Sequence, residues 1–133
     1  MGILPPDKES LAIIDINTLI GQTIDIKLKL NNTSFLVAST KDNLKLIIQV
    51  CDRLTITLRG ERESNQYIAG LMENASGMKT LTKKWQGAAS EEQRDNMFDE
   101  MVNNARTYIK AMINALSNLG CNVQELRQRI KDL

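Results

Sequence analysis

Histidine is absent from the sequence, and aromatic residues make up only 4% of its 133 residues. Without histidine, the chain has no Ser-His-Asp or Cys-His catalytic set and no metal site that uses imidazole. Cysteine is also scarce, since Cys51 and Cys121 lie far apart in the sequence and are too few for a zinc site of thiolates. We predict two buried, unreactive thiols, and we expect no catalytic residue, metal ligand or cofactor.

An excess of charge of either sign is missing too. The 17 Lys and Arg residues and 16 Asp and Glu residues give a net charge of +1, so we expect no nucleic-acid partner. No apolar run approaches the ~18 residues that a membrane span needs. The first residues also lack the basic and apolar regions of a cleaved signal peptide. We expect a protein that is cytoplasmic or is secreted without a cleaved signal peptide.

The first forty residues predict an N-terminal extension with a short helix and a small β-hairpin. Candidate N-cap residues precede an apolar run, and Gly21 follows it, which indicates a helix over 7–20. Residues 23–30 then carry an apolar side chain at every second position, the period of a strand. Asn and Thr residues over 31–33 favour a turn, and 34–38 would return as the partner strand.

Residues 40–60 support two interpretations. Their even positions are apolar, which suits strands, but the segment also has an apolar stripe at spacings of three and four. We favour a helix that starts with Thr40 as N-cap and reaches about residue 53, while 55–58 suits either state. In the alternative, residues 12–60 form a small antiparallel sheet, and the C-terminal helices pack on it in an α+β fold.

From residue 61 the helical signal is strong, although Ser76 and Gly77 interrupt its apolar run and would allow a kink. Residues 87–89 interrupt it, and Ser90 with Gln93 forms a capping box, in which the Ser hydroxyl accepts from the Gln amide and the Gln side chain bonds the Ser amide. Gly120 is placed to end the second long helix, and Asn122 precedes a last short one. We therefore predict a mainly α fold: an antiparallel helical hairpin or bundle over 41–133, preceded by the 1–40 extension.

Two groups of side chains on the second long helix are candidates for function. The carboxylates within 91–100 lie in its first turns and on its polar face, where we expect a solvated surface. Several methionines and a tyrosine fall on its apolar face, where they would fill the core or pair with another chain. The candidates for this core or partner-binding role are Met97, Met101, Tyr108 and Met112.

The only tryptophan of the chain stands at the junction of the two amphipathic helices. Trp85 can bury a large aromatic surface at the end of a hairpin. Gly87 would permit a positive φ or a close backbone approach in the turn. Together with Ala89 and the capped helix that follows, this segment resembles the WXG family, the small helical-hairpin proteins exported by type VII secretion systems. The resemblance covers about residues 41–133 and extends to the C-terminal apolar pattern.

This resemblance implies a homo- or heterodimeric bundle without catalysis, which acts as a secreted substrate, a partner or a targeting factor. The family's export motif, a tyrosine followed four positions later by Asp or Glu, has no match here, because Met112 follows Tyr108 at that spacing. A partner chain would then supply the export signal. The alternative function is a cytoplasmic α+β adaptor or chaperone-like binding protein.

Overall fold

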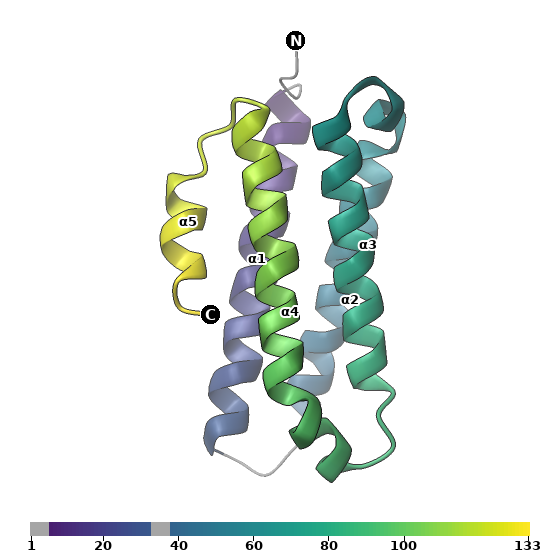
Figure 1. Cartoon of the computed structure of the whole chain (residues 1–133), viewed down its shortest axis with the longest axis vertical. Coiled ribbons are helices and arrows are strands. Elements are labelled where there is room, and N and C mark those ends of the chain that lie inside the picture. The colour runs from purple at the N-terminus through teal and green to yellow at the C-terminus, as the bar shows by residue number, and fades with distance from the viewer. Residues whose placement is uncertain (1–5, 33–37) are drawn as a thin grey trace.

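The protein is an α-helical bundle. The computed structural model describes residues 6–32 and 38–133, and within these ranges it contains no β-strand. Four long helices lie side by side and alternate in direction, and a short fifth helix runs along one flank (Figure 1). The elements in chain order are α1 (Pro6–Asn32), α2 (Ala38–Leu58), the 3-10 helix η1 (Arg59–Ser64), α3 (Gln66–Gln86), α4 (Glu91–Asn118) and α5 (Gln124–Ile130).

The four long helices form a closed ring around one core. Each of α1 and α3 packs against both α2 and α4, while α5 contacts α1 and α4. The buried apolar residues form a single cluster to which all five α-helices contribute. The prediction of a mainly α bundle is therefore confirmed. The segment predicted as an N-terminal extension contains α1, which is one of the four helices around that core.

The predicted β-hairpin is wrong wherever the structure describes it. Residues 23–32 continue α1, which is also much longer than the predicted helix over 7–20. Residues 33–37, which include most of the predicted return strand, lie outside the described residues. The alternation misled because Ile26 is buried while Leu28 is 57% exposed, so the apolar side chains of this segment do not share one face. Gly21 does not end the helix, and its missing side chain leaves space for the guanidinium of Arg129 on α5.

The helical stripe of 40–60 decides between the two interpretations of that segment. The predicted members of this stripe are all buried. The helix α2 also continues through 55–58 and ends at Leu58. The α+β alternative, with a sheet over 12–60, is therefore wrong within the described residues. Thr40 is not the N-cap, because α2 begins two residues earlier, at Ala38. The buried stripe consists of Leu44, Ile47, Cys51, Leu54 and Leu58.

The ends of α4 follow the predicted capping chemistry with one difference. The Ser90 hydroxyl accepts from the Gln93 amide at 3.1 Å, but the Gln93 side chain accepts from the amide of Ala89, at 2.8 Å, rather than from that of Ser90. At the other end Gly120 has a φ of 92°, as a C-terminal glycine requires. The amide of Gly120 donates to Ser117 and that of Cys121 to Leu116, which is the Schellman arrangement.

Candidate functional site

Trp85 lies in the last turn of α3 and is 1% exposed. Its ring is tilted by 46° against that of Phe98 on α4, with 6.4 Å between the centroids. Its indole N–H donates to the backbone carbonyl of Arg94 at 3.0 Å. The side chain thus joins the end of α3 to the start of α4 by both an apolar and a polar contact.

Hydrogen bonds from α4 hold the turn that follows Trp85, and the turn has an ordinary backbone conformation at Gly87. The guanidinium of Arg94 donates to the last carbonyls of α3, those of Trp85 (3.3 Å) and Gln86 (2.9 Å). The Trp85 carbonyl also accepts from the amide of Ala88, at 3.2 Å. Gly87 has a φ of −85°, so of the two expected alternatives, a positive φ or a close backbone approach, the first is absent. A Cβ at Gly87 would lie 3.3 Å from the carbonyl oxygen of Lys83, which is a close approach without a severe clash. Ala89 is bonded into the cap of α4.

The four predicted core or pairing residues of α4 differ in their accessibility. Met101 and Met112 are 1% and 0% exposed and fill the core of the chain itself. Met97 and Tyr108 are partly buried and pack against that core. Tyr108 lies over Gly77 of α3, where a Cβ would be 2.5 Å from its ring. In the single chain, Met97 and Tyr108 therefore retain some surface for a partner, whereas Met101 and Met112 are enclosed.

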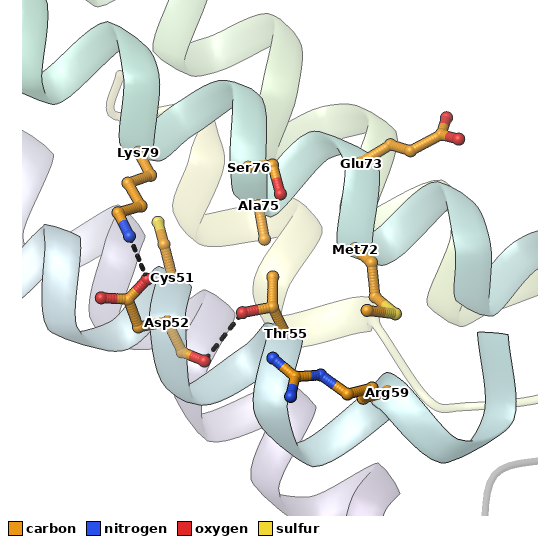
Figure 2. Close-up of a pocket in the computed structure, with 9 residues that line it drawn as sticks. All are labelled: Cys51, Asp52, Thr55, Arg59, Met72, Glu73, Ala75, Ser76 and Lys79. Atoms are coloured by element: carbon orange, nitrogen blue, oxygen red, sulfur yellow. Dashed lines mark hydrogen bonds and ion pairs between the residues drawn. The ribbon is translucent and has the colours of Figure 1, made fainter.

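A groove between α2 and α3 is lined by both polar and apolar side chains (Figure 2). It encloses about 570 Å³. Lys79 on α3 donates to the Asp52 carboxylate on α2 at 2.5 Å, and the Thr55 hydroxyl donates to the Asp52 carbonyl at 2.8 Å. In Figure 2 the Glu73 side chain extends away from the others. Lys79 and Asp52 are thus paired with each other across the groove.

The thiols do not add a nucleophile to this groove. Burial, followed by the nearby Asp52 charge, raises the pKa of Cys51 to about 12. Burial, with a contribution from Glu9, raises the pKa of Cys121 to about 11. Both side chains are buried and both are free, so the prediction of buried thiols is confirmed. At neutral pH they are protonated, and a protonated thiol is a poor nucleophile and metal ligand.

The seam between α1 and α2 contains buried polar groups that no sequence pattern predicted. Asp15 is 0% exposed and forms an ion pair with Arg53, whose side chain is 53% exposed. Asn43 donates to the Asp25 carboxylate at 2.5 Å. Three buried oxygens have no hydrogen-bond partner within the described structure, namely one each from Asp15, Gln22 and Thr40. Such groups cost free energy, because they lose water without full replacement.

The exposed large apolar side chains of the described residues all lie on the same two helices. Ile14 and Leu28 on α1 are 56% and 57% exposed, and Ile56 on α2 is 65% exposed. Leu11 and Leu46, on α1 and α2, are also exposed. Among the described residues, no large apolar side chain of α3, α4, α5 or η1 is exposed in this way. We call these five residues the α1–α2 apolar surface. The sequence offered a signal for Leu11 and Ile14 alone: the run from Leu11 to Ile20 is too apolar for a helix with only one buried face.

Comparisons of the chain with family models, with curated proteins and with solved structures found no match. Within the residues that the structure describes, no group of His, Cys, Asp and Glu side chains is placed to hold a metal ion. None of the described helices has the length and apolar character that would let it cross a membrane.

Proposed function

We propose that the chain is a non-catalytic protein-protein interaction protein. The observation that carries this proposal is the α1–α2 apolar surface, with its five exposed Leu and Ile side chains on two adjacent helices. Exposed apolar side chains that concentrate on one part of a molecule are typical of an interaction site, whereas singly scattered ones are ordinary. Contact with a partner chain would remove this apolar area from water, which is the main favourable term in protein association.

The WXG resemblance makes the proposal more specific. The α3–α4 pair is an antiparallel helical hairpin in which Trp85 is buried at the turn, and this arrangement supports a WXG-like role. The chain would act as a secreted substrate of a type VII secretion system, or as a partner or targeting factor for one. Met97 and Tyr108 retain exposed area on α4, away from α2, where they would form a separate contact. The cytoplasmic adaptor role remains the second candidate, and it requires the same apolar surface on an all-α scaffold.

The test is affinity capture of the tagged protein from its native cells, with the culture medium analysed alongside. We expect recovery with components of a secretion system or with another helical-hairpin chain, or appearance of the protein in the medium. A variant with Ile14→Glu and Ile56→Glu should lose the captured chain while its circular dichroism spectrum stays unchanged. The matched control is Gln49→Glu with Asn104→Glu, which adds the same charge at exposed polar positions.

The outcomes separate the two candidates. Capture of cytoplasmic proteins alone through the apolar surface, with none of the protein in the medium, would favour the adaptor role. Equal capture by the Ile14→Glu, Ile56→Glu variant and by the control would contradict the assignment of the apolar surface as the interaction site.

A further inference from the structure

A second surface of the bundle has a different chemistry. Where α5 lies against α4, the two helices enclose a hollow of about 270 Å³. Its apolar floor is formed by Ile113 of α4 and Ile130 of α5, which are 2% and 6% exposed. Its polar lining consists of Lys110, Asn114, Arg127 and Lys131. We call these six residues the α4–α5 groove.

The α4–α5 groove carries positive charge without a balancing carboxylate. Lys110, Arg127 and Lys131 are all exposed, and none of the three forms an ion pair in the part of the chain that the structure describes. A second hollow, of about 490 Å³, shares Arg127 and Lys131 and is also lined by no acidic residue.

The acidic residues of this region lie on another side of α5. Glu125 and Asp132 line a separate hollow, together with Arg129. The guanidinium of Arg129 is itself held by the carbonyl and side-chain oxygens of Asn17 on α1, at 3.1 and 2.6 Å. The carboxylates of this region therefore lie outside the α4–α5 groove, although the net charge of the whole chain is only +1.

We propose that the α4–α5 groove binds an acidic segment of a partner protein that inserts one apolar side chain between Ile113 and Ile130. The cations complement the carboxylates of the segment, and the buried isoleucines complement its apolar side chain. Nucleic acid fits less well, because its backbone needs a longer basic track and offers no apolar side chain for the floor. A membrane surface also fits less well, since electrostatic membrane binding uses clusters of about 4–8 cations rather than three around a hollow.

This proposal rests on the proposed interaction function, but it concerns a surface that is distinct from the α1–α2 apolar surface. The probe is a short fluorescein-labelled peptide of glutamates with one central leucine, measured by fluorescence anisotropy against the full chain. Two control peptides replace the leucine by serine or the glutamates by lysines. We expect saturable binding of the first peptide that weakens as salt is added, because salt screens charges at the surface. Both control peptides should bind more weakly.

The variant with Lys110→Gln, Arg127→Gln and Lys131→Gln should bind the peptide ~10-fold more weakly, the combined effect expected of three exposed cations. The matched control, Lys45→Gln with Lys83→Gln and Lys84→Gln, removes the same charge from exposed positions elsewhere and should bind like the parent chain. Circular dichroism checks that both variants remain helical.

Three results would overturn the proposal. The first is an absence of saturable binding at about 1 mM peptide, the weak end of the affinity scale. The second is an equal loss of binding in the groove variant and the control variant. The third is tighter binding of inorganic phosphate, an oligonucleotide or vesicles with anionic lipids than of the peptide. None of these results would change the affinity capture of a partner through the α1–α2 apolar surface. Failure of this proposal is therefore distinguishable from failure of the proposed interaction function.

Discussion

In the α3–α4 hairpin the largest buried side chain is Trp85, whereas the α1–α2 hairpin buries the carboxylate of Asp15. The first hairpin joins its helices through an aromatic pair and through backbone caps that Arg94 and Gln93 complete. The second joins them through the Asp15–Arg53 and Asp25–Asn43 contacts and leaves buried oxygens without partners. The α1–α2 hairpin also exposes large apolar side chains, whereas the described residues of α3 and α4 expose none.

This difference indicates that the two hairpins contribute differently to the stability of the bundle and to binding. Apolar packing is non-directional and contributes most of the folding free energy, so we infer that α3 and α4 form the more stable half. Buried polar groups contribute less net stability, and an apolar outer face gains most when another chain covers it. We infer that α1 and α2 are the half adapted to binding.

Replacement of Trp85 by alanine should give the largest loss of stability. The variant loses a fully buried aromatic side chain, for which ~3–5 kcal/mol is typical. It also loses the hydrogen bond from the indole to the Arg94 carbonyl. Chemical denaturation followed by circular dichroism measures the free energy of unfolding. Trp85→Phe keeps a ring but removes the N–H donor and should lose less. A Trp85→Ala variant within about 1 kcal/mol of the parent chain would contradict the assigned stability of the α3–α4 hairpin.

Removal of Arg53 should expose the weakness of the α1–α2 hairpin. Arg53→Ala leaves the Asp15 carboxylate buried without its ion partner, which costs ~3–5 kcal/mol for a fully buried pair. Because the Arg53 side chain is 53% exposed, water can reach the site, and we expect about 2–3 kcal/mol instead. The hydrogen bond that Arg53 donates to the Asp15 carboxylate also raises the pKa of Arg53 above its ordinary value.

The double variant Asp15→Leu, Arg53→Met sharpens this test. It removes both charges and keeps apolar volume, so its stability should equal or exceed that of the parent chain. The same denaturation experiment compares it with Arg53→Ala. If the double variant loses as much stability as Arg53→Ala, the ion pair is a net source of stability and the two hairpins are more alike than we infer.

Two glycines of α3 should respond to alanine in opposite directions. At Gly77 a Cβ would lie 2.5 Å from the Tyr108 ring, so Gly77→Ala should destabilise the α3–α4 contact by ~1–3 kcal/mol. At Gly70 nothing lies within 4 Å of the added Cβ, so Gly70→Ala should stabilise the helix by about 0.5–1 kcal/mol. Thermal unfolding of both variants measures the difference. Tyr108→Leu should restore part of the loss in Gly77→Ala, and an unchanged loss would exclude the Tyr108 ring as its cause.

The sequence was sufficient for the helices with strong helical patterns. The helical signal of α3 and α4 is strong, and Ser90 and Gly120 mark the boundaries of α4 by chemistry that acts within a few residues. The burial of Trp85 and of both cysteines also followed from residue type alone.

The sequence was insufficient where polar residues face the interior. Asp15 and Thr23 stand on the buried face of α1 and interrupt its apolar stripe, so the alternation over 23–30 dominated the prediction. The Thr23 hydroxyl is satisfied by the carbonyl of Leu19 at 2.8 Å, a bond that exists only once the helix has formed. The contact of Gly77 with Tyr108 and the α4–α5 groove join residues from different helices, and no local pattern encodes them.

Alanine substitutions at the glycines that follow α3 and α4 should change the stability least, and by different amounts. Gly120 has a φ of 92°, which a side chain makes unfavourable, so Gly120→Ala should cost about 1 kcal/mol. Gly87 has an ordinary φ, and its added Cβ would be 3.3 Å from the Lys83 carbonyl, so Gly87→Ala should cost less. Thermal unfolding of the two variants gives the order of their costs. A larger loss at Gly87 would mean that the carbonyl cannot shift, and that the turn beside Trp85 is as tightly constrained as the Schellman turn after α4.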